Sequence, residues 1–379
     1  MQINFFSNSI KSLNLDLMTT SSEKFEYESA YNLAKNAGTT VNIYSAGLDY
    51  GRQEGNTFIN LFGIGGKSKW DIYRNLDDFL ENKIKYIGTV FIFYGYDLFQ
   101  VLNLIYLKYK YRFKLLGFIF DSHIGAIEHL AYVKKIVANT YFHTSINLLK
   151  LLDGYILFQK AAASELRLKK PFYVTKPGID PNSIGIDTTC SNRKSLIFTI
   201  TYLGSLLPYN GIDALLNSFA LSTDPEIRLR VFGNGILQKQ IIDYSKRDER
   251  VYYGGLINHK QVKDELKTTN LLINLRDPES YICKFAYPSK LVEYMASGIP
   301  VLSTDLDFDA EMRECLYLVK ELEPNEILRM INHIKEKGPE YNAEKAKKAK
   351  KYIIENNNWN EISKGLYKYI SGFGKENGL

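Results

Sequence analysis

The sequence contains few cysteines. Its 379 residues include only three, Cys190, Cys283 and Cys315, and they lie far apart along the chain. An odd and widely spaced set argues against a disulfide framework and against a thiolate metal site. We therefore expect each cysteine to act as a small apolar side chain in the packing of the protein.

Long apolar segments are also missing. No run of about 18 uncharged apolar residues occurs, so the sequence predicts no membrane-spanning helix. The opening residues, MQINFFSNSIKS, do not combine a basic start with an apolar stretch and a small-residue cleavage site. These two absences lead us to expect a cytoplasmic protein.

The charge balance lacks a strong excess of either sign. The formal net charge is +6, from 48 Lys and Arg against 42 Asp and Glu, and most of the excess lies in the N-terminal half. This excess is too small for a dedicated nucleic-acid binder, so we expect no nucleic-acid partner. It suits a face that meets an anionic partner or a membrane surface.

What the chain does contain is a repeated alternation of strand-like and helix-like segments. An apolar share of 45% and a length of 379 residues fit a soluble protein of two domains. Short apolar runs, typical of buried strands, occupy residues 2–8, 39–47, 89–95, 114–121 and 154–158, and then 195–204, 227–235, 250–255, 270–276 and 300–304. Helical patterns separate them, which predicts two doubly wound α/β domains with parallel sheets, joined near TKPGID. A ligand held by both domains would lie in the cleft between them.

One short segment, YPSKLVEYMASGIPVLSTDL at residues 287–306, predicts a helix of about two turns before a buried strand. Pro288 suits the first turn of a helix, and Ser289 can cap it. Gly298 fits a left-handed C-terminal stop, and Pro300 prevents continuation.

The start of this helix is a candidate phosphate site. Its free N–H groups and positive dipole end would point to the carboxyl edge of the sheet, where Lys284 and Lys290 add positive charge. Glu293, three residues after Lys290, could accept hydrogen bonds from two neighbouring hydroxyls, such as those of a ribose. The alternative is that Lys290 and Glu293 form an ordinary exposed ion pair.

The same segment resembles the nucleotide-binding segment of retaining GT-B glycosyltransferases of the large family 4 type, especially bacterial surface-polysaccharide members. The shared patterns are Tyr-Pro-Ser-Lys, Glu-Tyr-Met-Ala-x-Gly and Pro-Val. Earlier motifs of this half occur in the family's order: TYLGSL, YNGIDALL, VFGNG, RVYYGGLINHKQV and NLLINLRDP. KPGID resembles the family's linker, and NNNWNEI resembles the tryptophan before its last helix. The resemblance covers most of residues 171–370. The N-terminal half is matched in its strand–helix rhythm and around FDSH.

The resemblance implies a GT-B fold of two Rossmann-like domains facing a cleft. Residues 1–175 would form the acceptor-side domain, residues 176–355 the nucleotide-sugar-binding domain, and residues 356–379 a helix that crosses back to the N-terminal domain. The implied activity is transfer of a sugar from a nucleotide-diphosphate donor, a UDP-sugar, to a saccharide acceptor in surface polysaccharide or glycoconjugate synthesis. The enzyme would be a retaining, metal-independent hexosyltransferase. No cofactor is implied, because the nucleotide sugar is a substrate.

The resemblance also implies roles for particular residues. His123 would reach the sugar from the opposite domain, Glu293 would hold the ribose, and Lys290 would meet the diphosphate, so these three are the candidate catalytic residues. The implied donor-binding residues are Gly204, Ser205, Leu256, Arg276, Lys284, Phe285, Ala286, Tyr287, Ser289, Lys290 and Glu293.

The chain departs from the family pattern at two places. Phe285 stands where the family often has a first Glu, and Ser205 with Tyr209 or Asn210 replaces the usual basic pair. Donor contacts would then come partly from Lys284 and Arg276. The departures favour an alternative, a non-catalytic GT-B-like subunit that binds an acceptor or a partner protein. A nucleotide-sugar epimerase of the same fold lacks the paired acidic and histidine residues that would support it.

Two glycine and acidic patterns have simple structural explanations. Asp305, Asp307 and Asp309 alternate and could hold a divalent metal, but they also suit a polar loop after a strand, which we favour. VFGNG lacks the third glycine of a dinucleotide fingerprint, so Gly233 and Gly235 are expected to be turn glycines.

The stretch YLKYKYRFK at residues 106–114 mixes aromatic and basic side chains, including Lys108, Lys110, Arg112 and Lys114. Such residues can bind a lipid interface, which would place the enzyme at the inner face of the cell membrane near a lipid-linked acceptor. The favoured alternative is a helix packed on the sheet with a solvated basic end. The sequence contains no indication of the oligomeric state.

Overall fold

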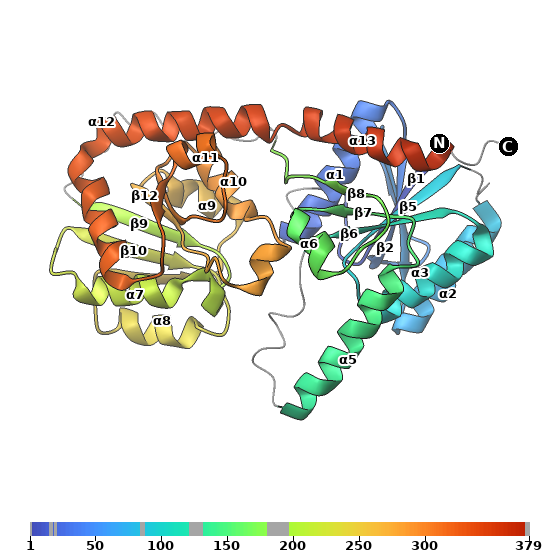
Figure 1. Ribbon diagram of the computed structural model, residues 1–379, viewed down its shortest axis with the longest axis horizontal. Coiled ribbons are helices and arrows are strands. Elements are labelled where there is room, and N and C mark those ends of the chain that lie inside the picture. Colours follow the sequence, from blue (N-terminus) through green and yellow to red (C-terminus); the bar gives the residue numbers. More distant parts are fainter. Residues whose placement is uncertain are drawn as a thin grey trace. The chain divides into compact units, whose positions relative to one another are not determined.

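The computed structural model describes residues 2–14, 18, 21–83, 88–120, 132–179 and 197–375. Contacts divide the chain into two compact units. Unit 1 comprises Met1–Gly178, Lys284–Tyr287 and Trp359–Leu379, and unit 2 comprises Ile179–Cys283 and Pro288–Asn358. Each unit is an α/β layer structure in which helices cover a sheet (Figure 1).

Unit 1 contains an eight-stranded sheet in the order β3-β4-β2-β1-β5-β6-β7-β8. Its strands are β1 (Gln2–Ser7), β2 (Val41–Asp49), β3 (Gln53–Gly55), β4 (Ile59–Gly65), β5 (Thr89–Tyr94), β6 (Lys114–Ile119), β7 (Gly154–Leu157) and β8 (Phe172–Val174). The expectation of purely parallel sheets is wrong at one edge, because β3 pairs antiparallel with β4. Only residues 56–58 join β3 to β4, and a connection this short can join two neighbouring strands only as an antiparallel pair.

The helices of unit 1 are α1 (Ser21–Ala37), α2 (Lys69–Lys83), α3 (Leu98–Tyr111), α5 (Tyr132–Leu149), α6 (Lys160–Glu165) and α13 (Trp359–Lys375). α13, from the end of the chain, packs against α1 (Figure 1). β3, β4 and α2 fall between residues 48 and 88, where the sequence patterns predicted no element.

Unit 2 contains a six-stranded sheet in the order β11-β10-β9-β12-β13-β14. Its strands are β9 (Phe198–Leu203), β10 (Ile227–Phe232), β11 (Val251–Gly255), β12 (Leu271–Asn274), β13 (Val301–Thr304) and β14 (Tyr317–Val319), and the neighbouring strands pair in parallel. The strand order reverses between β9 and β12. In open sheets of this kind, ligands bind at the carboxyl ends of the strands beside this reversal.

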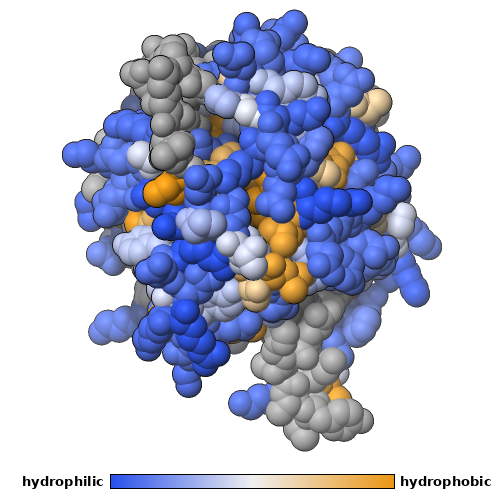
Figure 2. Space-filling model, turned by 90° about the vertical axis from the view of Figure 1, so that its left-hand side faces the viewer, coloured by the Kyte–Doolittle hydropathy of each residue, from blue (hydrophilic) through white to orange (hydrophobic). Residues whose placement is uncertain are grey.

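The helices of unit 2 are α7 (Ile212–Leu221), α8 (Gln238–Ser245), α9 (His259–Leu266), α10 (Ser289–Ala296), α11 (Ala310–Cys315) and α12 (Pro324–Asn356), with the short 3₁₀ helices η4 (Pro208–Asn210) and η5 (Tyr281–Lys284). The side chains seen on the side of α7, α8 and α12 are mostly hydrophilic, with one small central group of hydrophobic residues and a few others scattered around it (Figure 2).

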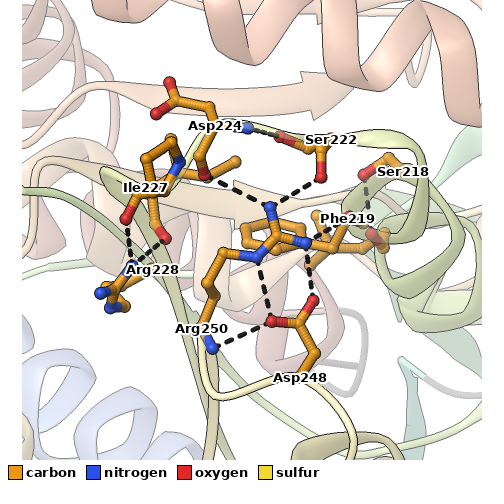
Figure 3. Close-up of polar contacts among 10 residues, drawn as sticks. Ser218, Phe219, Ser222, Asp224, Ile227, Arg228, Asp248 and Arg250 are labelled. Carbon is orange, nitrogen blue, oxygen red and sulfur yellow. Dashed lines mark hydrogen bonds and ion pairs between the residues drawn. The ribbon is translucent and has the colours of Figure 1, made fainter.

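A largely buried arginine, Arg250, lies in unit 2 between the end of α7 and the start of β11 (Figure 3). The Arg250 guanidinium makes a bidentate pair with the Asp248 carboxylate, at 2.9 and 2.7 Å. It also donates to the carbonyl oxygens of Phe219, Ser222 and Asp224. A cation at this position is favourable, because it donates to carbonyl groups at the end of α7 and in the loop that follows it.

Candidate functional site

α10 begins directly after Pro288 and spans eight residues, which is the predicted length of about two turns. Pro288 occupies the N-cap position without a capping side-chain hydrogen bond, and Ser289 is the first helical residue. The expectation that Ser289 caps the helix is therefore wrong, because the helix starts one residue earlier than a serine cap at 289 requires. Gly298 has a φ of 72°, the left-handed conformation expected after the helix.

A tyrosine joins α10 to the strand reversal. The Tyr294 hydroxyl donates to the Leu203 carbonyl oxygen at 2.6 Å and accepts from the Leu203 N–H at 3.1 Å. Leu203 is the last residue of β9. α10 is thus held beside the carboxyl end of β9, although sequence analysis assigned Tyr294 no role.

The loop after β9 contains the predicted phosphate-pocket residues Gly204 and Ser205. The Ser205 carbonyl oxygen accepts hydrogen bonds from the Tyr202 hydroxyl at 2.7 Å and from Asn210 Nδ2 at 2.8 Å. Gly233, after β10, has a φ of 134°, and a Cβ there would lie 1.8 Å from the Gly204 carbonyl oxygen. Gly233 is therefore a turn glycine, as expected, and it also permits close backbone approach.

Arg276 follows β12, on the other side of the strand reversal. Its Nε and Nη1 atoms are buried, and neither has a hydrogen-bond partner among the residues that the structure describes. Burial raises the pKa of the nearby Tyr202 hydroxyl, and the positive charge of Arg276 opposes this rise. The guanidinium therefore carries unused donors at the carboxyl edge of the sheet, which is an arrangement suited to an anion.

Lys290 and Glu293 contact each other on α10. Their Nζ and Oε2 atoms are 2.8 Å apart, and the side chains are 41% and 47% exposed. The pair has the geometry of an ordinary surface ion pair, which alone contributes at most about 1 kcal/mol. A diphosphate that binds Lys290 would have to compete with this carboxylate.

The segment before α10 belongs to unit 1 by its contacts. Lys284 Nζ lies 2.7 Å from Glu165 Oε1, and the Tyr287 ring packs near Phe158. Phe285 is fully buried, so any donor contact at this position would come from its backbone. Ala286 is partly buried.

The remaining predicted site residues are dispersed or lie elsewhere. Leu256, just after β11, is 72% exposed and could border a base. His123 lies outside the described residues.

The acidic residues after β13 have structural contacts that fit the polar-loop interpretation. Asp305 and Asp307 pair with Arg313, and the Asp309 carboxylate caps α11 by accepting from the Met312 N–H. Among the described residues, no group of three or more acidic, histidine or cysteine side chains could hold a metal ion.

The basic residues of 106–114 are largely paired with carboxylates. Lys110 contacts Asp77 at 2.7 Å, and Lys108 and Lys114 both contact Asp153. These pairs are what a helix end packed on its own unit would make. Three large hydrophobic side chains of α3 are also exposed: Leu102, Tyr106 and Tyr109 follow a spacing of four and three residues, which places them on one face.

The comparisons with known proteins agree with this architecture. Residues 197–336, less than half of the chain, match the family model described as "Glycosyl transferases group 1". The predicted resemblance to GT-B glycosyltransferases is confirmed. No curated protein sequence matches the chain significantly.

Solved structures share the fold of the whole chain. A sucrose-phosphate synthase from Thermosynechococcus elongatus has a TM-score of 0.74 at 16% identity, covering 97% of this chain and 98% of that one. HepE from Anabaena, in complex with UDP, has a TM-score of 0.70 at 14% identity, covering 98% and 100%. WaaG, a glycosyltransferase involved in lipopolysaccharide biosynthesis, has a TM-score of 0.66 at 13% identity, covering 98% and 100%. At these identities the likeness establishes the GT-B fold.

Proposed function

We propose that the protein is a glycosyltransferase that moves a sugar from a UDP-sugar to a hydroxyl of a saccharide acceptor, in surface polysaccharide or glycoconjugate synthesis. Unit 2 would bind the donor, and unit 1 would bind the acceptor. The single observation that carries this proposal is the placement of Arg276, with two buried unpartnered donor atoms, at the strand reversal beside α10. The group 1 glycosyl transferase match over residues 197–336 supports the same assignment.

Several named residues would meet the donor. Arg276 and the N-terminal amides of α10 would contact the diphosphate, together with Lys284, Ser289, Lys290 and the backbone of Gly204 and Ser205. Glu293 would accept from the ribose, and Leu256 would border the base. Phe285 would contribute its backbone, Ala286 and Tyr287 would border the sugar, and His123 would approach the sugar from unit 1.

The chemical step requires stabilisation of a leaving diphosphate. Negative charge grows on the diphosphate as the glycosidic bond breaks, and fixed amides with a fixed guanidinium stabilise it without rearranging. These groups would take the role that a metal ion has in other enzymes, so we propose metal-independent transfer with retention of anomeric configuration. Measured hydrolysis of UDP-glucose should then persist in excess EDTA, and the released sugar should keep its anomeric configuration by NMR.

Calorimetry with UDP and GDP tests the donor site. We expect UDP to bind the purified protein, and Lys290→Ala and Glu293→Ala to weaken UDP binding and UDP-sugar hydrolysis by about tenfold or more, the loss of one charge-assisted contact. Lys267→Ala is the matched control, because Lys267 and Asp264 form an exposed pair of the same spacing at the end of α9. If neither UDP nor GDP binds, the transferase proposal is rejected and the non-catalytic binding role is favoured.

We also propose that the enzyme acts at the inner face of the cell membrane, on a lipid-linked acceptor. No described helix is long and apolar enough to span a bilayer, so the contact would be peripheral. The exposed face of Leu102, Tyr106 and Tyr109 supports it, since aromatic residues favour the interfacial region.

Vesicle flotation tests the membrane contact. With phosphatidylglycerol-containing vesicles, the double variant Tyr106→Ser/Tyr109→Ser should lose most of the bound fraction, because it removes the apolar area that would enter the interface. Tyr252→Ser is the control, since Tyr252 in unit 2 is similarly exposed. If both variants float with the vesicles to the same extent as the wild type, this face does not bind the membrane.

A further inference from the structure

The backbone of β9 alternates between its two neighbouring strands. The Thr199 N–H and carbonyl both bond with Asn270, just before β12, at 2.8 Å. Thr201 is paired with Leu272 of β12, whereas the Gly204 N–H donates to Phe232 of β10. Because successive residues of a strand point their peptide groups to opposite sides, Leu203 faces β12, as Thr199 and Thr201 do.

β12 does not supply the last pair of hydrogen bonds on that side. The pairing of β9 with β12 covers Ile200 and Thr201, while the pairing with β10 continues to Leu203. The Leu203 N–H and carbonyl instead bond with one atom, the Tyr294 hydroxyl oxygen of α10. A side chain thus takes the place of a strand at the point where the sheet reverses its order.

The hydroxyl is well suited to a fixed structural role. The Tyr294 side chain is only 4% exposed. Burial raises the pKa of its hydroxyl well above the usual value, so the proton that Leu203 accepts stays in place at all working pH values. Tyr294 follows Glu293 directly and lies about one turn after Lys290 on the same two-turn helix, so a shift of its ring would also displace these two residues.

We propose that Tyr294 is a positioning residue for the donor site, whose hydroxyl holds α10 beside Leu203, the residue before the Gly204–Ser205 loop, at the strand reversal. The inference rests on the proposed function, since the site that Tyr294 would shape is the diphosphate site. Within the loop region itself, the Tyr202 hydroxyl and Asn210 Nδ2 donate to the Ser205 carbonyl oxygen. Tyr294 joins Leu203, the residue just before this loop, to the helix that carries Lys290 and Glu293.

The test compares Tyr294→Phe with Tyr317→Phe in the full-length protein. Each substitution removes one buried hydroxyl from unit 2. Tyr317 donates to Asn342 Oδ1 at 2.6 Å and begins β14, at the opposite end of the strands from the donor site. Hydrogen exchange followed by mass spectrometry should show faster exchange at residues 203–206 and 289–293 in Tyr294→Phe and unchanged exchange there in Tyr317→Phe.

Calorimetry with UDP distinguishes a positioning role from a purely structural one, because a purely structural role would leave the UDP dissociation constant unchanged. We expect the UDP dissociation constant to rise about tenfold in Tyr294→Phe and to stay at the wild-type value in Tyr317→Phe, because displaced groups lose much of their binding energy. Unchanged exchange in Tyr294→Phe, or faster exchange with wild-type UDP affinity, would overturn the positioning role alone. Wild-type protein that does not bind UDP would overturn the proposed function and the donor role of Tyr294 with it.

Discussion

Replacement of Arg276 by methionine should abolish most UDP binding while leaving the protein at least as stable as the wild type. Arg276 Nε and Nη1 are buried and unpartnered among the described residues, so the guanidinium is costly in the free protein. Methionine fills a similar volume without that cost. The dissociation constant for UDP, measured by calorimetry, should rise about 100-fold, the loss expected for a buried bidentate phosphate contact.

Two further variants sharpen this experiment. Arg276→Lys keeps the charge but loses the planar fork, so its UDP affinity should fall between those of the wild type and Arg276→Met. Arg230→Met removes an arginine of unit 2 that pairs with Glu265 and should leave UDP affinity unchanged. Wild-type UDP affinity in Arg276→Met, or a marked loss of stability, would show that the side chain supports the fold and not the donor.

The largest expected stability effect belongs to Arg250→Met. The substitution removes a bidentate ion pair and the guanidinium hydrogen bonds to the carbonyl oxygens of Phe219, Ser222 and Asp224. Because the Arg250 and Asp248 side chains are only 16% and 17% exposed, water replaces these contacts poorly. We expect the free energy of unfolding of unit 2 to fall by about 3 kcal/mol.

The measurement must report on unit 2. Both tryptophans, Trp70 and Trp359, lie in unit 1, so tryptophan fluorescence would miss the change. Urea unfolding followed by hydrogen exchange of unit 2 peptides avoids this problem. Arg228→Met is the control, since the Arg228 guanidinium bonds only to nearby carbonyl oxygens in Figure 3, those of Pro225 and Ile227. Equal stability of the two variants would contradict the role given to Arg250.

The pH dependence of the Arg250 effect has a definite sign. Hydrogen bonding from Arg250 lowers the pKa of the Asp248 carboxyl below its unfolded value. The stabilisation is therefore complete above the unfolded pKa of about 4 and is lost as the pH falls through the lower folded value. The stability difference between the wild type and Arg250→Met should shrink as the pH is lowered below about 4.

Apolar runs predicted most of the strands, because buried parallel strands have a distinctive composition. β3, β4 and α2 were not predicted: β3 has only three residues, and β4 contains two glycines and a polar asparagine that interrupt its pattern. The strand β14 was not predicted either, because three residues are too few to show an alternation of apolar and polar side chains.

The site was predicted unevenly for physical reasons. Arg276 could be proposed because a charged residue directly after a buried strand must lie at the carboxyl edge. Tyr294 could not, since a tyrosine on the apolar face of a helix usually signals core packing. The lysines of 106–114 suggested a lipid contact because their partners, Asp77 and Asp153, are distant in sequence.

The assignment of Lys284–Tyr287 to unit 1 affects any attempt to separate the halves of the enzyme. The polypeptide leaves unit 2 after Cys283 and re-enters it at Pro288, so the two units are interleaved along the sequence. A recombinant fragment of residues 179–358 would carry Phe285, a fully buried side chain, away from the unit to which it belongs. Exchanging donor-side halves between related enzymes would therefore require transplanting four residues of one half together with the other.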